Sequence, residues 1–184
     1  MSSARKEIMK ELSACVLAVS DGECEAFIGY FDKGRSLFFA GAGRSGLAVR
    51  GFAMRAMHLG YTTHVIGDVS TPAIKENDLL LIASGSGNTE SLVSMATKAK
   101  ALGAKILLLT INPSSKIGKM ADSIIQIPAP SPKVDEATDF TSIQPMGTLA
   151  EQTMNIVFDS LVLDLMKKNN TTSEEMFKNH ANLE

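Results

Sequence analysis

The stretch SLFFAGAGRSG, residues 36–46, joins a short apolar run to a glycine-rich loop, and it sets how the rest of the chain is interpreted. The apolar part, residues 36–41, stops at a glycine, which is typical of a buried strand. A helical pattern at 45–59 follows the loop. A buried strand, a glycine loop and a helix in this order predict the beginning of a strand–helix–strand unit in a parallel sheet.

The same design recurs along the chain. Four more apolar runs are expected to be strands: residues 62–66, 78–84, 105–110 and 123–127. Helical patterns lie at 3–20, 22–32, 89–102, 115–120, 147–168 and 173–179. Near-continuous apolar strands alternating with helices predict an α/β fold with a doubly wound five-stranded parallel sheet flanked by helices. We expect one domain over residues 1–184, with two N-terminal helices, a long C-terminal helix and a proline-rich loop at 128–145.

Composition excludes several classes of function. The chain has 184 residues and a net charge of -2, and it shows no basic patch that would favour nucleic acid. No stretch approaches the roughly 18 apolar residues of a membrane span, and charges interrupt the N-terminal apolar runs, which argues against a signal peptide. Cys15 and Cys24 belong to no CxxC or Cys/His cluster. We therefore expect a cytoplasmic protein without a disulfide framework or zinc site.

Two glycine-rich loops connect a predicted strand to a predicted helix: the first glycine loop, GAGRSG (41–46), and the second, SGSGNTES (84–91). In open parallel sheets, ligands bind beyond the carboxyl ends of the strands, where helix N-termini supply free N–H groups for an anion. The second loop adds hydroxyls that suit a phosphate or a sugar: Ser84, Ser86, Thr89 and Ser91. Alternatively these residues only make a turn, with Asn88 or Thr89 capping the helix. Two such loops in one small sheet favour the anion site.

The first glycine loop also matches the dinucleotide fingerprint G-x-G-x-x-G, and Asp68 follows at about the distance of a ribose-binding acid. Three observations weigh against a nucleotide-binding module. Two helices are predicted before the first strand, the serine-rich second loop has no role in dinucleotide binding, and the chain leaves no room for a separate catalytic domain.

Six motifs, taken in order and spacing, resemble those of the 6-phospho-3-hexuloisomerases, which are built on the sugar isomerase (SIS) domain. They are GAGRSG, FAMRAMHLG (52–60), SGSGNTES, INPSSKIGKMAD (111–122), QPMGTLAEQ (144–152) and MFKNHANLE (176–184). The glycine loops are shared by SIS domains in general, whereas QPMGTLAEQ and the NHANLE ending narrow the resemblance to this isomerase. It extends from about residue 36 to residue 184.

The resemblance implies interconversion of D-arabino-hex-3-ulose 6-phosphate and D-fructose 6-phosphate through a cis-enediol, without metal or cofactor. This reaction serves formaldehyde fixation or detoxification in the ribulose monophosphate route. It also implies a homotetramer with active sites between subunits. In such an enzyme one base removes the proton from C2 and returns it at C3.

The resemblance also assigns roles to particular residues. Glu151 matches the proton acceptor, and His180 matches a histidine that a neighbouring subunit contributes in related sugar isomerases. The substrate and its phosphate would contact Ser45, Ser84, Gly85, Ser86, Gly87, Asn88 and Thr89. Without the resemblance, Glu151 would be interpreted as a helix-start glutamate favoured by the helix dipole, and His180 as an exposed residue near the terminus.

Two further candidates are His58 and Arg44. A neutral histidine can move protons between O2 and O3 near pH 7, so His58 competes with His180 for this role, although it could equally pack at a subunit interface. Arg44 could pair with the phosphate or with a neighbouring subunit. The acidic residues of the proline-rich loop, Asp135, Glu136 and Asp139, belong either to a solvated loop or to a lid.

Two other functions remain open from the sequence. One is a different SIS isomerase, such as an arabinose-5-phosphate isomerase. The other is a non-catalytic sugar-phosphate-binding domain, as in transcriptional regulators with this fold. A regulator needs a DNA-binding module, and the predicted helices at 3–32 mix acidic with basic residues, which argues against one.

Overall fold

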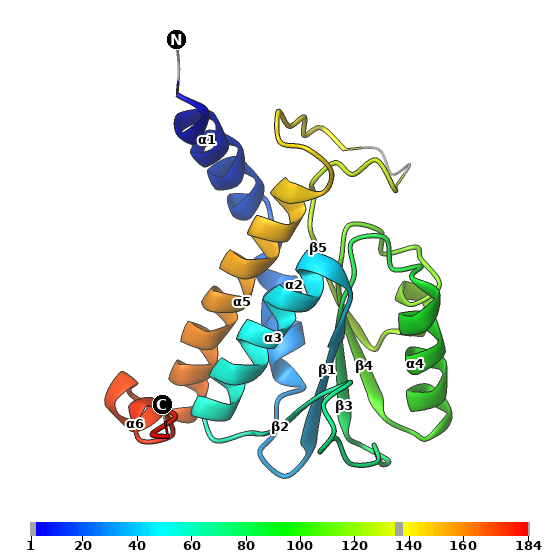
Figure 1. The fold of residues 1–184 in the computed structure, drawn as a ribbon, viewed down its shortest axis with the longest axis vertical. Helices are drawn as coiled ribbons and strands as arrows, with labels where there is room; N and C mark the ends of the chain where they lie inside the picture. The colour runs from blue at the N-terminus through cyan, green and yellow to red at the C-terminus, as the bar shows by residue number, and fades with distance from the viewer. Residues whose placement is uncertain (1–2, 135–137, 184) are drawn as a thin grey trace.

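The computed structural model describes residues 3–134 and 138–183, and its centre is a sheet of five parallel strands in the order β2-β1-β3-β4-β5 (Figure 1). The strands are β1 (Ser36–Gly41), β2 (Thr62–Val65), β3 (Leu79–Ala83), β4 (Lys105–Thr110) and β5 (Ser123–Gln126). The chain proceeds outward from β1 to β2 and then returns past β1 to β3. The strand order therefore reverses between β1 and β3, where open α/β sheets bind their ligands. The first glycine loop follows β1, and the second follows β3.

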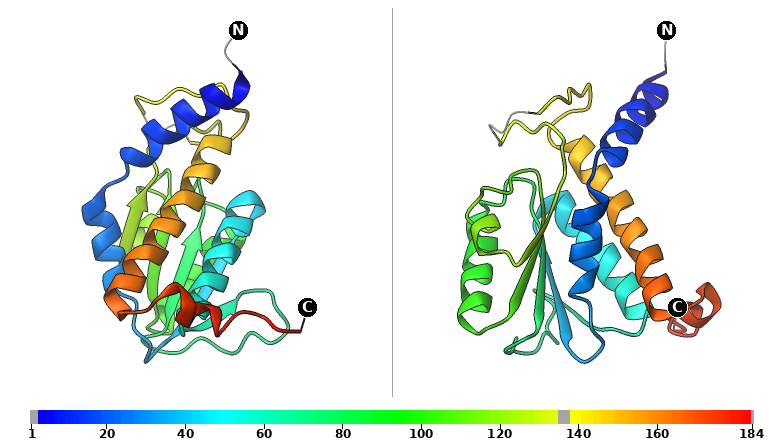
Figure 2. Two further views of the ribbon diagram at one scale, coloured as in Figure 1. Left: turned by 90° about the vertical axis from the view of Figure 1, so that its left-hand side faces the viewer. Right: turned by 180° about the vertical axis from the view of Figure 1, so that it is seen from behind.

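Helices cover both faces of the sheet (Figure 2). The helical elements are α1 (Ala4–Leu17), α2 (Asp21–Gly29), α3 (Gly43–His58), α4 (Glu90–Ala101), the 3₁₀ turn η1 (Gly118–Met120), α5 (Thr148–Asn169) and α6 (Ser173–Phe177). On one face α2 and α3 pack on the strands and α5 packs over both, while α4 and η1 cover the other face. The predicted α/β fold is confirmed, with element ends within a few residues of those expected, although the helical pattern at 115–120 forms only η1.

The central strands β1, β3 and β4 are almost continuously apolar because each one contributes to two cores. In β1, Leu37 and Phe39 face the larger core beneath α2, α3 and α5, whereas Phe38 and Ala40 face the smaller core beneath α4. The other central strands alternate in the same way. A strand buried on both faces loses the polar side of the usual alternation, which explains the continuous apolar runs in the sequence.

The first glycine loop makes a sharp turn in which the backbones of Gly41 and Gly46 are in close contact. A methyl group on Gly41 would lie 2.8 Å from the Gly46 Cα, and one on Gly46 would lie 2.7 Å from the Gly41 carbonyl oxygen. Gly43 has a φ of +58°, which glycine adopts without steric cost. This contact holds the start of α3 against the end of β1. The first turn of α3, with Arg44 and Ser45, therefore lies at the carboxyl edge of the sheet.

Helix α5 begins at that same edge and runs beside α3 in the same direction, so that both helices end at the opposite side of the molecule (Figure 1). Its end is capped by Asn170 with a φ of +49°. The short helix α6 and residues 178–183 then lie against the far end of α3. No helix in the described parts of the chain is both long and apolar enough to span a bilayer.

The proline-rich segment, residues 128–145, forms no helix or regular strand in its described part, as expected. It makes a single antiparallel bridge between Ser131 and Val134. Of the acidic group proposed for a lid, Asp135 and Glu136 lie outside the described residues, and Asp139 is exposed.

Candidate active site

A cavity of about 300 Å³ lies at the carboxyl edge of β1 and β3, where the strand order reverses. Its wall comes from five segments of the chain: the two glycine loops, Ile111 after β4, the proline-rich segment and the start of α5. This volume is at the lower end of the range for small-molecule sites. The cavity brings together five of the seven residues predicted to contact the substrate, one from the first glycine loop and four from the second: Ser45, Ser84, Gly85, Ser86 and Thr89.

One side of the cavity is formed by the hydroxyls of the second glycine loop. Ser84 is buried, and its Oγ accepts the backbone N–H of Gly87 at 3.1 Å. Gly87 has a φ of +60°, and a side chain there would collide with Ser115. Thr89 is the N-cap of α4 but makes no side-chain capping bond, so its hydroxyl remains able to contact a ligand. This tight loop directs hydroxyls and helix N–H groups toward the cavity.

Gly87 and Asn88, which were also predicted to bind substrate, take another position in the loop. The Asn88 Oδ1 accepts the backbone N–H of Lys116 at 2.9 Å, and the Gly87 carbonyl accepts that of Ile117 at 3.2 Å. Among the described residues, neither belongs to the cavity wall. Both attach the loop to the segment after β4, so in this structure they support the residues that face the cavity.

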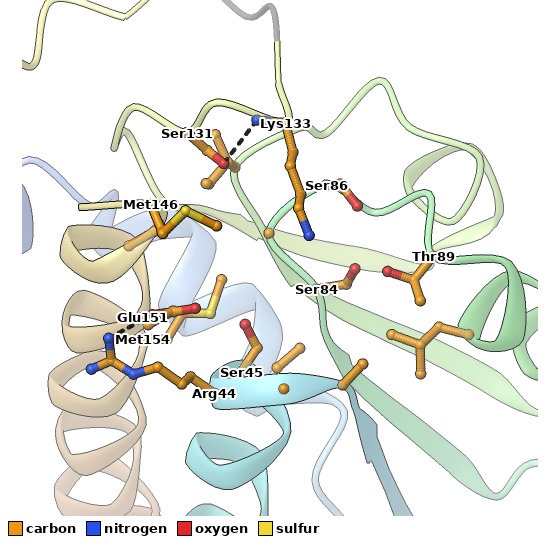
Figure 3. A pocket seen from close by; sticks show the side chains of 18 of the residues that line it. Arg44, Ser45, Ser84, Ser86, Thr89, Ser131, Lys133, Met146, Glu151 and Met154 are labelled. Atoms are coloured by element: carbon orange, nitrogen blue, oxygen red, sulfur yellow. Dashed lines mark hydrogen bonds and ion pairs between the residues drawn. The ribbon is translucent and has the colours of Figure 1, made fainter.

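The opposite side of the cavity carries the predicted base (Figure 3). Glu151 lies in the first turn of α5, and its Oε2 is 3.0 Å from the Arg44 Nη1. The same Arg44 nitrogen donates to the Thr148 Oγ1 at 3.1 Å, and the Thr148 hydroxyl donates to the Pro145 carbonyl at 2.6 Å. The Glu151 side chain is 22% exposed, so solvent or a small ligand can reach it. Ser45, nearly buried, lies beside this group.

Lys133 is a residue of the cavity that the sequence did not identify. It follows a proline in the proline-rich segment, and its side chain points into the cavity toward the hydroxyls of the second glycine loop (Figure 3). Composition predicted only an irregular loop at 128–145, and a single lysine in such a loop carries no periodic signal. Lys133 reaches the site because the proline-rich segment passes over the carboxyl edge of the sheet.

The two candidate histidines lie together but far from this cavity. His58 ends α3, and its ring stacks on that of His180 with centroids 5.5 Å apart. The Asn179 side-chain amide donates to the His58 carbonyl at 3.0 Å and holds the C-terminal segment there. Because the 22 residues of α5 span about 33 Å, Glu151 and His180 of one chain lie at opposite ends of the molecule.

The environment of His58 disfavours its charged form. Burial lowers its pKa below the ordinary value of 6.5, and repulsion from Arg55 and then from His180 lowers the pKa further. The Arg55 Nη1 lies 3.2 Å from the His58 Nδ1, so the neutral ring accepts there. His64, the remaining histidine of the chain, lies in β2 with its ring 5.0 Å from that of Phe38.

Known proteins resemble this chain over most of its length. Residues 30–156 match the model of the SIS domain. The 3-hexulose-6-phosphate isomerase of Bacillus subtilis is 46% identical over 178 residues, which cover 97% of this chain and 96% of the relative. The 3-hexulose-6-phosphate isomerase of Mycobacterium gastri is 46% identical over 148 residues, covering 80% and 73% of the two chains.

The fold has relatives among solved structures. A hypothetical protein of Methanococcus jannaschii, whose crystal structure was taken to infer a molecular function of 3-hexulose-6-phosphate isomerase, superposes with a TM-score of 0.83 at 31% identity. The match covers 96% of this chain and 98% of that protein. The matches to the Bacillus subtilis and Methanococcus jannaschii proteins therefore extend over nearly the whole length of both.

Proposed function

Because the chain belongs to the SIS-domain proteins and, within them, to the family of the 3-hexulose-6-phosphate isomerases, we propose that it interconverts D-arabino-hex-3-ulose 6-phosphate and D-fructose 6-phosphate. This is the isomerisation of a sugar phosphate that belongs to the ribulose monophosphate pathway. The observation that carries the proposal is the cavity itself, in which the Glu151 carboxylate faces the hydroxyls of the second glycine loop.

The reaction moves a ketone from C3 to C2, and Glu151 supplies the base that this requires. In the forward direction its carboxylate removes the proton from C2, and the electrons of that bond form a C2–C3 double bond while negative charge develops on O3. The resulting cis-enediolate is reprotonated at C3 by the same carboxyl group, and a proton passes from O2 to O3. A single base serves both carbons if they lie on one side of it.

The remaining walls of the cavity hold the substrate. Serine and threonine hydroxyls with the α4 N-terminus suit the phosphate oxygens. Ser45 and the ion-paired Arg44 lie near Glu151, where negative charge develops on the sugar oxygens. When the phosphate binds at one side of the cavity, C2 and C3 of the sugar therefore lie next to the Glu151 carboxylate at the other side.

A second copy of the chain supplies the histidine in this proposal. Helices α3 and α5 run in the same direction, with Glu151 at one end of the pair and His180 at the other. A two-fold axis perpendicular to both helices would place the His180 end of one subunit beside the Glu151 end of its partner. Large apolar side chains one heptad apart on each helix are exposed and suit such an interface: Leu47, Met54, Ile156 and Leu163. A homotetramer built from such pairs, as the family resemblance implies, is part of the proposal.

We assign the enzyme to the cytoplasm. Cys15 and Cys24 are both free thiols, which suits a reducing compartment.

The direct test is formation of fructose 6-phosphate from the hexulose phosphate by wild type, Glu151→Gln and a control, Glu25→Gln. Glu25 is an exposed carboxylate on α2. We expect kcat to fall about 10²- to 10⁴-fold in Glu151→Gln, the usual effect of losing a general base, and to stay unchanged in the control. A wild type that turns over arabinose 5-phosphate instead, or that binds sugar phosphates without turnover, would overturn the proposal.

A further inference from the structure

We propose that Lys133 is the cation that neutralises the substrate phosphate, and that the proline-rich segment delivers it over the second glycine loop. This deepens the proposed function and rests on it. Its ammonium would face the phosphate from the side opposite the hydroxyls of Ser84, Ser86 and Thr89.

The charges in the cavity wall single out Lys133. Among the described residues that line the cavity, three are charged: Arg44, Lys133 and Glu151. Arg44 is engaged with Glu151 and Thr148 at the other side. No described residue forms an ion pair with Lys133. A phosphate dianion at the hydroxyl side would therefore meet one uncommitted positive charge, and charge-assisted bonds are the strong ones in phosphate recognition.

The local structure fixes the backbone at Lys133, an exposed residue of the cavity wall. Its backbone N–H donates to the Ser131 Oγ at 3.3 Å, and the bridge between Ser131 and Val134 closes a tight turn around it. Val134 is partly buried against the larger core. With its neighbour directed inward, the turn holds Lys133 above the cavity, and Figure 3 shows the side chain descending toward the hydroxyls.

The position also suits selectivity for a phosphorylated ligand. Lysine acts as a compact point charge with three donors, which bonds a tetrahedral anion in several orientations. The hydroxyls of the second glycine loop bond neutral sugars and phosphates alike, whereas the ammonium bonds the anion much more strongly than a neutral hydroxyl. Lys133 would therefore contribute to binding through the phosphate and leave the proton transfer at Glu151 nearly unaffected.

The experiment compares Lys133→Ala and Lys133→Arg with Lys98→Ala, which removes an exposed lysine of α4 outside the cavity wall. We expect Lys133→Ala to raise KM for the hexulose phosphate about 10- to 100-fold, as for a lost bond to a charged group, with kcat within about threefold. Lys133→Arg should recover much of the loss, and Lys98→Ala should match wild type. The KM effect should shrink at high salt, which screens partly exposed charges.

Binding of inorganic phosphate tests the role of Lys133 directly. It distinguishes a lost phosphate contact from a general structural effect of the substitution, and it does not depend on the proposed isomerase activity. The inhibition constant of phosphate, and its dissociation constant by calorimetry, should rise in Lys133→Ala by about the same factor as KM. A raised KM with unchanged phosphate affinity would overturn the proposal, as would an unchanged KM. If the wild type fails to isomerise the hexulose phosphate, the function falls, and calorimetry with phosphate still decides the role of Lys133.

Discussion

Arg44 and Glu151 form an ion pair, with the Arg44 Nη1 3.0 Å from the Glu151 Oε2, and this pair joins the first turn of α3 to the first turn of α5. The Arg44 side chain is 55% exposed, so the pair contributes at most about 1 kcal/mol to stability. Its position at the cavity suggests a larger effect on catalysis, because it fixes the direction of the carboxylate.

The first prediction separates these two effects. Arg44→Ala should lower kcat by about 10- to 100-fold, since small misplacement of a catalytic group has effects of this order, and should change Tm by only a few degrees. Lys100→Ala, which breaks a partly exposed ion pair with Asp122 beyond the sheet, is the control. Steady-state kinetics and thermal unfolding measure both. An Arg44→Ala enzyme with full kcat would show that the pair is only structural.

The second prediction concerns the two halves of the site. Glu151→Gln and His180→Ala should each be nearly inactive alone, and mixed subunits should regain activity. In a random mixture, one site in about four combines an intact Glu151 with an intact His180 from the partner copy, by the symmetry of a two-fold pair. Activity after refolding the variants together and separately provides the measurement. No gain on mixing would place both residues in one subunit's site or remove His180 from it.

The third prediction concerns Glu11, a residue of α1 that holds the end of the proline-rich segment. Its carboxylate accepts the Ser142 hydroxyl at 2.7 Å, the Ile143 N–H at 2.8 Å and the Gln144 side-chain amide at 3.1 Å. Glu11→Ala should loosen residues 142–144, which lead directly into α5 and Glu151. Hydrogen exchange at the Ile143 amide should accelerate and kcat should fall several-fold. Glu7→Ala, one turn earlier on α1, should change neither quantity.

The hydrogen bonds between Glu11 and residues 142–144 should weaken as the pH falls. The three hydrogen bonds, led by that of the Ile143 N–H, lower the pKa of Glu11 below its ordinary 4.5. A carboxyl with a lowered folded-state pKa contributes stability above its unfolded pKa and loses that contribution as the pH falls through the folded value. Protection of the Ile143 amide, relative to the exchange rate of an unstructured chain at the same pH, should thus hold down to about pH 4.5 and fall only below it. A loss of protection already near pH 6 would contradict this.

The fourth prediction uses His58, whose pKa burial lowers below 6.5. Because the unfolded chain binds the proton more readily, stability should fall as the pH drops below about 6.5 and should level off below the folded-state pKa. His58→Asn should flatten this part of the Tm-versus-pH curve. A wild-type Tm that does not change between pH 7 and pH 5 would count against a buried neutral His58.

The sequence predicted the sheet because its signals are local. Buried strands such as Leu79–Ala83 are apolar at every position, and the glycines after β1 and β3 mark turns whose close contacts other residues cannot make. Parallel strands bring those turns to one edge, so the position of the hydroxyl loop follows from the order of strands and glycines along the chain.

The contacts that complete the site are not local, and periodicity does not encode them. Arg44 and Glu151 are more than a hundred residues apart in the chain, and Glu11 reaches a segment 131 to 133 residues away. Lys133 lies in a stretch whose prolines indicate only irregular backbone. The positions of Asn88 and Gly87, turned toward the segment after β4, likewise depend on where that neighbouring segment passes.

Helix α5 acts as a spacer between two chemical groups that different copies of the chain would bring together. A substitution on its surface leaves that spacing intact, but deleting one residue shortens it by about 1.5 Å and turns everything beyond it by about 100°. The length of α5 is therefore constrained separately from its composition, so homologues with a longer or shorter α5 would need a different arrangement of subunits.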